Sequence, residues 1–187
     1  HICEEIWEKM GRKDFVSLTA WPKPDEAKVD ISAEENEALI RNMLEDTLNI
    51  FRATNITPKK ICYYTAASWK WKTYLKTLEK SVSTKIVQSE LMRELMKDAE
   101  MKKVAKHITK FVGQIIDEVN RMPSEKKRRQ LKVGIIDENK ALKEAEAFFE
   151  REFNAEICVY REEDPDCYDP KKRAQLARPY RPAIYIE

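Results

Sequence analysis

The feature that most constrains this chain is an apolar helix face that begins at its second residue. The apolar residues of the first stretch recur at helical spacing, and they are Ile2, Cys3, Ile6, Trp7 and Met10. Residues spaced in this way lie on one side of an α-helix, and Gly11 is suited to ending that helix. No capping residue precedes the face, and an apolar face needs partners to cover it. We therefore expect the chain to be part of a longer protein, divided within a helical bundle.

A segment rich in proline and charge follows the first helix and predicts a domain boundary. The sequence WPKPDEAKVD, residues 21–30, contains two prolines among charges of both signs, which favours an irregular linker. We place the boundary near Val29. Residues 1–29 are then the tail of a helical bundle with its linker, and residues 30–187 form a second domain long enough to bury its own core.

The second domain is predicted to contain six or seven helices. Apolar residues at helical spacing predict helices over residues 32–54, 67–79, 85–97, 98–121, 125–131, 138–153 and 171–177. Ser32, Asp98, Ser124 and Asp137 are the predicted N-caps, because such side chains accept hydrogen bonds from free helix amides. The inward faces are expected to include Val87 and Phe148.

Three short segments rich in β-forming residues predict a small sheet. They are residues 60–66, 156–161 and 183–187, whereas residues 133–136 are ambiguous between strand and loop. Together with the helices, these strands predict a helix-rich α+β domain with about three strands.

Composition excludes several classes of protein. The chain is 36% charged with a net charge of only +2, which is typical of a soluble, folded protein. The chain contains no run of about 18 apolar residues, which is the length needed to span a membrane. The four cysteines are Cys3, Cys62, Cys158 and Cys167, and none forms a C-x-x-C pair that would indicate zinc. We expect reduced thiols in a cytoplasmic protein.

Catalytic motifs are not found in the chain. With only three glycines, neither a P-loop nor a G-x-G-x-x-G motif can form, and no G-x-S-x-G elbow occurs. We expect His107, on a lysine-rich helix, to be a surface residue. The acidic loop of Glu162, Glu163, Asp164, Asp166 and Asp169 could bind a divalent cation, but it lacks the glycine and the terminal glutamate of a calcium loop. We interpret it as a solvated acidic loop.

Two basic runs are the strongest candidate binding site. The first contains Lys126, Lys127, Arg128, Arg129 and Lys132, and the second contains Lys171, Lys172, Arg173, Arg178 and Arg181. Such clusters bind phosphate groups through counterion release, and these contacts position a nucleic acid without reading its sequence. The alternative is that both runs are solvated faces balanced by nearby glutamates.

Aromatic and cationic residues alternate in Trp69-Lys70-Trp71-Lys72. Such rings could stack on unpaired bases. On a helix, however, Trp69 and Trp71 point about 200° apart, so we expect one of them to lie in the core.

Both ends of the chain resemble a known family. The pattern H-x-x-E-E-[IL]-W-E-x-[ML]-G, followed by V-x-L-x-x-W-P, resembles the end of the anticodon-binding bundle of class I aminoacyl-tRNA synthetases for aliphatic amino acids. The matching residues are His1, Glu4, Glu5, Ile6, Trp7, Glu8, Met10, Gly11, Val16, Leu18, Trp21 and Pro22. The segment RPYRPAIYIE, residues 178–187, is similar to the C-terminus of archaeal-type leucyl-tRNA synthetases.

This resemblance implies a role in binding leucine tRNA through its long variable arm. In the family, the C-terminal domain reads that arm, and by resemblance this role falls on Tyr185, Ile186 and Glu187. A carboxylate accepts a hydrogen bond from an exocyclic base amine but is repelled by phosphate. We therefore assign the basic residues to the RNA backbone and the terminal residues to base reading.

The family's ATP-holding motifs, H-x-G-H and K-M-S-K-S, do not occur in this chain. We expect this segment to hold no cofactor, with ATP and Mg²⁺ bound by upstream domains of a parent leucine–tRNA ligase. The expected partners are leucine tRNA and those upstream domains, with neither membrane nor DNA involved. A rival interpretation is a protein-interaction module that docks a partner subunit through residues 1–10 and the Lys/Glu-rich helices. A small hydrolytic enzyme has no nucleophile–base pair to support it.

Overall fold

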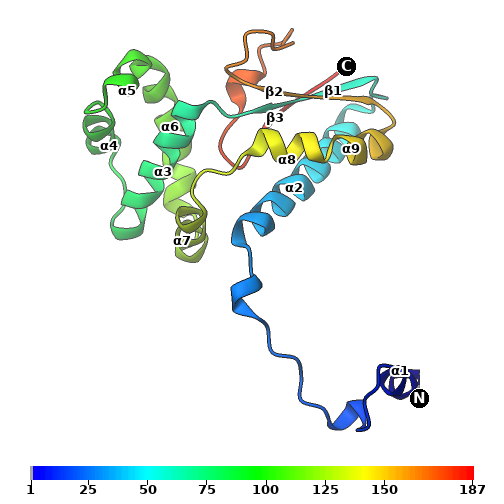
Figure 1. Ribbon diagram of the computed structural model, residues 1–187. Helices are drawn as coiled ribbons and strands as arrows, with labels where there is room; N and C mark the ends of the chain where they lie inside the picture. The colour runs from blue at the N-terminus through cyan, green and yellow to red at the C-terminus, as the bar shows by residue number, and fades with distance from the viewer. Residues whose placement is uncertain (1) are drawn as a thin grey trace. The chain divides into compact units, whose positions relative to one another are not determined.

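The computed structural model describes residues 2–187, with the backbone alone at Glu26, and divides them into two compact units at Asp30 and Ile31. The first unit contains α1 (Ile2–Lys9), η1 (Val16–Leu18) and η2 (Glu26–Lys28) (Figure 1). Gly11, at φ +82°, follows the helix in a conformation that residues with a Cβ rarely adopt. The Glu4 carboxylate accepts from the Val16 amide at 2.9 Å, which holds the following loop against α1.

Most apolar side chains of the first unit are exposed. No residue of α1 is buried. The exposed fraction is 72% for Ile2 and 91% for Trp21. His1, which belongs to the motif of the first stretch, lies outside the described residues.

The second unit combines eight α-helices with a three-stranded sheet, which confirms the predicted α+β class. The helices are α2 (Ile31–Thr54), α3 (Ser68–Ser83), α4 (Gln88–Leu95), α5 (Ala99–Lys103), α6 (Ala105–Arg121), α7 (Ser124–Val133), α8 (Glu138–Glu144) and α9 (Glu146–Phe153), with a short 3-10 helix, η3 (Ala174–Leu176). The strands are β1 (Lys60–Thr65), β2 (Glu156–Arg161) and β3 (Ala183–Ile186).

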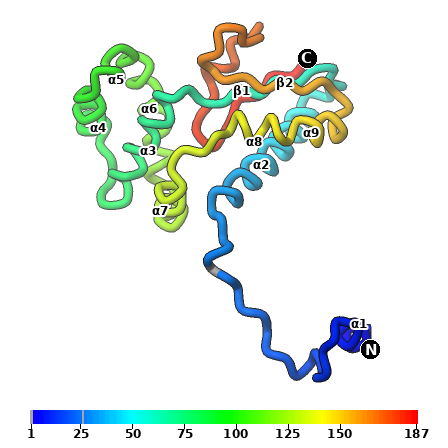
Figure 2. The backbone as a smooth tube through the Cα atoms, in the orientation of Figure 1, coloured from blue at the N-terminus to red at the C-terminus, as the bar shows by residue number. Residues whose placement is uncertain are grey.

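Strand β1 lies at the centre of the sheet, in the order β2-β1-β3. It pairs in parallel with β2, where Lys60 aligns with Glu156, and antiparallel with β3, where Ile61 aligns with Ile186. The chain leaves β2 and makes a long excursion before it returns as β3 beside β1 (Figure 2). All three predicted strands are confirmed.

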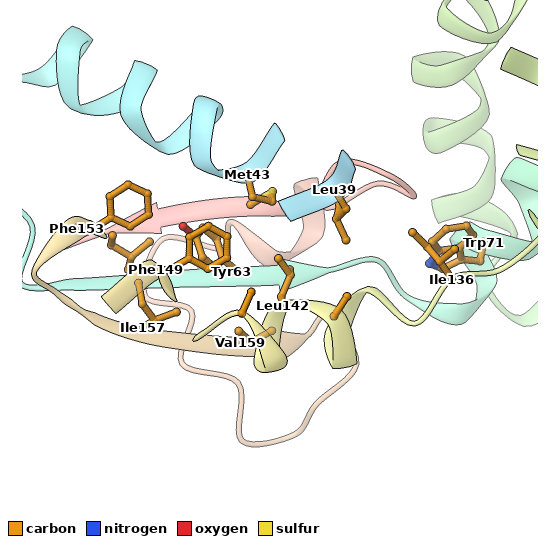
Figure 3. Close-up of a cluster of buried hydrophobic side chains, with 13 residues drawn as sticks. Leu39, Met43, Tyr63, Trp71, Ile136, Leu142, Phe149, Phe153, Ile157 and Val159 are labelled. Carbon is orange, nitrogen blue, oxygen red and sulfur yellow. The ribbon is translucent and has the colours of Figure 1, made fainter. Parts of the chain in front are cut away.

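Helices α2, α8 and α9 cover one face of the sheet (Figures 1 and 3). Met43 of α2 and Phe149 of α9 contribute to this core, and the Tyr63 ring of β1 lies 5.2 Å from that of Phe149. The Tyr63 hydroxyl and the Thr47 hydroxyl share a hydrogen bond at 3.0 Å, so the buried phenol is satisfied. On the other face, Cys62 and Tyr64 pack against residues 174 and 177.

Helices α3 to α7 form a second helical core beside the sheet. Leu78, Leu91 and Ile108 are fully buried there, and helix α3 joins this core to the sheet because it follows β1 directly. Asp98 caps α5 by accepting from the Glu100 amide at 2.9 Å, as predicted. Asp137 likewise caps α8 through the Lys140 amide at 3.1 Å.

Several predicted helix boundaries are wrong. The segments 98–121 and 138–153 each form two helices, because Val104 (φ −111°, ψ 20°) and Ala145 (φ −90°, ψ 0°) leave helical geometry. Neither Ser32 nor Ser124 is an N-cap, since α2 begins at Ile31 and α7 begins at Ser124 itself.

The helix predicted for residues 171–177 is also wrong. Lys172 has a positive φ of 53°, which interrupts a right-handed helix, and only η3 follows. The Asp169 carboxylate still accepts from the amides of Arg173 and Ala174, at 2.7 and 2.8 Å. Asp169 therefore binds the amides at the start of a helical turn, but that turn is only the 3-10 helix η3.

The two neighbouring phenylalanines of α9 provide a test of the core. Phe148 was predicted to face inward but is 39% exposed, whereas Phe149 is fully buried against β1. We expect Phe149→Ala to lower the free energy of unfolding by about 3–5 kcal/mol and Phe148→Ala to cost about 1 kcal/mol or less. Urea unfolding of both variants checks this, and equal losses would contradict the described core.

Candidate nucleic-acid interface

Three depressions that share lining residues lie along α2, and we call them together the groove. The first depression is bordered by Lys126 and Arg129 of α7. The middle depression shares Lys126 with the first and Arg181 with the third. Arg173 and Arg178 line the third. The fold thus brings side chains from both runs to one surface feature.

The first basic run divides between solvent and core. Lys126, Arg128, Arg129 and Lys132 of α7 are exposed. Lys127 is only 5% exposed, and its ammonium group donates to the Ser81 carbonyl of α3 at 3.4 Å. Because this ammonium is directed into the protein, Lys127 does not remain among the candidate phosphate ligands.

The second basic run lies on the excursion between β2 and β3. Lys171, Lys172 and Arg173 are exposed, and Arg178 and Arg181 follow in a tight turn in which each backbone amide donates to the other's carbonyl. We call residues 173–182 the arginine segment. Tyr180, within its turn, has a positive φ of 62°, an uncommon conformation for a residue with a large side chain.

Carboxylates of α2 and α6 pair with three arginines of the groove. Arg129 contacts Glu34 and Glu35 at 2.6 and 2.5 Å, Arg178 contacts Glu118 at 3.3 Å, and Arg181 contacts Asp46 at 3.9 Å. The arginine side chains remain 35–66% exposed. Such exposed pairs contribute about 0–1 kcal/mol, so an arriving phosphate could exchange with these carboxylates at little cost.

Six cations of the two runs have no ion-pair partner among the residues that the structure describes. Among the described residues, no carboxylate lies within ion-pairing distance of Lys126, Arg128, Lys132, Lys171, Lys172 or Arg173. These six side chains are exposed. They are available to a polyanion without exchange of an internal partner.

The predicted base-reading residues lie at the edge of the sheet. Tyr185 faces the Cys62 side with its ring 6.4 Å from that of Tyr168, whereas Ile186 packs against the core on the opposite side. The Glu187 carboxylate accepts from the Tyr168 hydroxyl at 2.9 Å. Its backbone amide donates to the Lys60 carbonyl, so the backbone at residue 187 is paired in the sheet.

Lys70, near the start of α3, is a buried cation that holds the arginine segment. It is 3% exposed, and its ammonium group donates to the carbonyls of Gln175 and Ala177, at 2.7 and 2.8 Å. A third contact, at 2.8 Å, is an ion pair with Glu162. Burial lowers the pKa of Lys70, and the Glu162 carboxylate opposes part of that effect.

Glu138, at the start of α8, holds the same segment from the other side. It is 2% exposed, and its carboxyl oxygens accept from the Tyr180 amide at 2.6 Å and the Ala66 amide at 3.4 Å. Burial raises the pKa of Glu138 to about 8, against the opposing effect of these two amides.

The acidic loop is solvated only in part, because several of its carboxylates accept from backbone amides while Glu163 and Asp166 are exposed. Glu162 and Glu163 bind the amides of Ala67 and Ser68 at the start of α3, at 3.2 and 3.0 Å. Free amides at a helix N-terminus favour such negative partners. In the described part of the chain, no group of three or more His, Cys, Asp or Glu side chains is arranged to hold a metal ion.

The Trp-Lys-Trp-Lys segment does not form a stacking platform. Trp71 is 4% exposed and Lys70 is buried, while the Trp69 ring packs edge-on against Phe111 with centroids 5.6 Å apart. One tryptophan is therefore in the core, as predicted. His107 is exposed, which confirms the surface interpretation.

Comparison with known proteins adds independent evidence. A family model for the anticodon-binding domain of tRNA ligase matches residues 1–63. Over this whole chain, the leucine–tRNA ligase of Methanosarcina barkeri is 39% identical and that of Pyrococcus horikoshii is 40% identical, both across 188 residues. That of Methanococcoides burtonii is 38% identical across 189 residues. Over its whole length the chain is therefore similar to archaeal leucine–tRNA ligases.

The chain spans about a fifth of the length of the curated relatives it matches, since it covers 19% of the Methanosarcina barkeri ligase and 17% of the Pyrococcus horikoshii ligase. The matches fall in the C-terminal part of these relatives. The anticodon-binding family model covers the first unit of this chain and extends through α2 into β1. The division into a bundle tail and a tRNA-binding domain remains a prediction.

Among the described residues, no helix is long and apolar enough to cross a membrane.

Sequence reasoning missed both Lys70 and Glu138. A signal existed for Lys70, because Tyr74 and Thr77 lie four and seven residues later on the same helical side and are both buried. A lysine in such a position is expected to be buried with partners. No such signal existed for Glu138, which resembles any acidic residue in the first turn of a capped helix.

The buried Glu138 predicts a pH dependence of stability. The folded protein retains a proton at Glu138 up to about pH 8, whereas the unfolded chain releases it near the ordinary pKa of 4.5. This contribution to stability is complete below pH 4.5 and is lost as pH rises through 8, with a slope of up to about 1.4 kcal/mol per pH unit. Urea unfolding across this range should show a shallower slope for Glu138→Gln than for the wild type. Equal slopes would contradict the assignment.

Proposed function

We propose that this chain is a tRNA-binding segment of a leucine–tRNA ligase, and that it positions leucine tRNA through the long variable arm. The groove along α2 carries the proposal, because it joins cations from two distant parts of the sequence on one surface. The homology to leucine–tRNA ligases along the whole chain supports the choice of partner.

The proposed mechanism is positional. Exposed cations of α7 and the arginine segment bind phosphates of the RNA backbone, and these contacts set the register of the tRNA on the protein. They are Lys126, Arg128, Arg129, Lys132, Lys171, Lys172, Arg173, Arg178 and Arg181. Lys127 is left out because its ammonium group is directed into the protein.

Base reading is assigned to the edge of the sheet at Tyr185, Ile186 and Glu187. The Glu187 carboxylate is exposed and is oriented by the Tyr168 hydroxyl, and the Tyr185 ring lies beside it on β3. A carboxylate held in this way can accept from the exocyclic amine of an unpaired base. Ile186, whose side chain packs into the core, would contribute through its backbone and by fixing its neighbours.

The chemical steps would belong to segments outside this chain. Joining leucine to tRNA requires ATP and Mg²⁺, and the residues of this chain offer neither a nucleotide-binding motif nor, among those described, a cluster of metal ligands. Upstream domains of the same ligase are the proposed partners that supply this chemistry.

A protein-interaction module remains the second candidate function. The observation that favours it is the exposed apolar surface of the first unit, with Ile2, Met10 and Trp21 each more than half exposed. Such patches usually contact other protein surfaces. RNA binding with a steep salt dependence distinguishes the two candidates.

The arginine turn provides the direct test. We expect Arg178→Ala and Arg181→Ala each to weaken binding to every RNA and to reduce the salt slope of the association constant by about one. Fluorescence anisotropy with labelled leucine tRNA, which has a long variable arm, and with a short-arm tRNA, each between about 50 and 300 mM salt, measures both quantities. Weak, salt-insensitive binding by the wild type would overturn the proposal.

Glu187 tests base reading separately from phosphate binding. Glu187→Ala leaves the backbone pairing of β3 possible, so the chain should fold with unchanged stability. We expect the preference for the long-arm tRNA over the short-arm tRNA to fall by about 1–3 kcal/mol, the scale of one specific base contact. Equal weakening for both tRNAs would show that Glu187 does not read bases.

A further inference from the structure

The arginine segment has little regular structure of its own, so other elements must hold it. It contains the single turn η3 and one isolated pair of hydrogen bonds between Arg178 and Arg181. Yet Ala174 and Ala177 are buried against the sheet, and Tyr180 adopts a left-handed conformation. An uncommon backbone conformation persists where the surrounding contacts determine it.

Two buried ionisable side chains supply those contacts. Lys70 donates to the carbonyls of residues 175 and 177, on the N-terminal side of the arginine turn. Glu138 accepts the Tyr180 amide at 2.6 Å, within the turn itself. The two side chains come from the first turns of α3 and α8, and both bind backbone atoms. The contacts therefore determine where the backbone runs, whichever side chains it carries.

The Tyr180 side chain completes the arrangement. Its hydroxyl donates to the Gly134 carbonyl at 3.2 Å, and its ring lies 5.1 Å from the Trp71 ring and 6.1 Å from the Tyr74 ring. Arg178 and Arg181 flank this anchored residue, and both line the third depression of the groove. A shift of the Tyr180 backbone would move both guanidinium groups together.

We propose that Lys70 and Glu138 are positioning residues that hold the backbone of the arginine segment, so that Arg178 and Arg181 present two phosphate ligands at a fixed spacing. This inference rests on the proposed function, because it explains how the same RNA-binding surface is preorganised. Groups held in place before binding do not lose that freedom on association, which favours affinity.

The main variant removes the acceptor at the turn. Glu138→Leu should weaken binding to leucine tRNA by about tenfold and reduce the salt slope by up to about two, because both arginines lose their fixed spacing. Glu138→Gln keeps an amide oxygen that can accept from Tyr180, so it should restore affinity to within about twofold of the wild type.

A core variant controls for a general loss of stability. The control is Phe153→Leu. The Phe153 ring, in α9, packs against the rings of Phe51 and Phe149, with centroids 5.3 and 5.9 Å apart, and contacts no aromatic ring of the arginine segment. The substitution should shift the urea midpoint while leaving the salt slope unchanged. If Glu138→Leu left both affinity and slope at wild-type values, the positioning role would be wrong.

A double-mutant comparison separates this inference from the proposed function. Adding Glu138→Leu to an Arg178→Ala/Arg181→Ala background should cause no further loss of affinity, because the positioned groups are already absent. A full additional tenfold loss would overturn the inference. If the two arginine substitutions had no effect in the wild-type background, the proposed function itself would fail.

Substitution of Lys70 provides a second, independent test of the positioning role. Because a single substitution would leave the partly buried Glu162 without its ion-pair partner, Lys70→Met is combined with Glu162→Gln. This pair should reproduce the reduced salt slope even if Glu138→Leu does not fold. A folded Lys70→Met/Glu162→Gln variant with wild-type affinity and slope would overturn the inference for Lys70.

Discussion

Strand β1 is paired along both edges and covered on both faces. The arrangement of the other elements of the second unit follows from the burial of this strand. Residues 61–65 are all buried, so every polar backbone group of the strand needs a partner within the protein. Strands β2 and β3 supply these partners. Helices α2, α8 and α9 cover one face, and the arginine segment covers the other. The proposed RNA-binding residues thus lie on a segment whose first task is to complete the core.

The two buried ionisable side chains follow from the same requirement. An irregular segment that packs over a sheet carries backbone carbonyls and amides without helical or strand partners. Burying such groups unpaired costs more than pairing them with a buried side chain that is itself satisfied. Lys70 and Glu138 satisfy these groups on opposite sides of the arginine segment, and each is satisfied in return. Stability and the geometry of the groove therefore depend on the same few contacts.

Local patterns predicted the elements but not the long-range contacts. The three strands and the caps at Asp98 and Asp137 were predictable, because strand composition and capping act between near neighbours in sequence. The breaks at Val104 and Ala145 were not, since neither residue is a helix breaker such as glycine or proline. The sequence alone could not show that Lys127 is buried, because its ammonium group is covered only when α3 packs against α7. The groove along α2 could not be predicted, because it joins segments that only the complete fold brings together.

The sheet order also has a consequence for how this chain folds during synthesis. Lys60 of β1 and its partner Glu156 of β2 are 96 residues apart, and β3 follows later still. Strand β1 therefore leaves the ribosome long before either neighbour exists, with both of its edges unpaired. Contacts over such distances slow folding, and unpaired strand edges promote aggregation. This apolar strand must therefore avoid pairing with other protein chains until the arginine segment covers its face and β3 pairs with its edge.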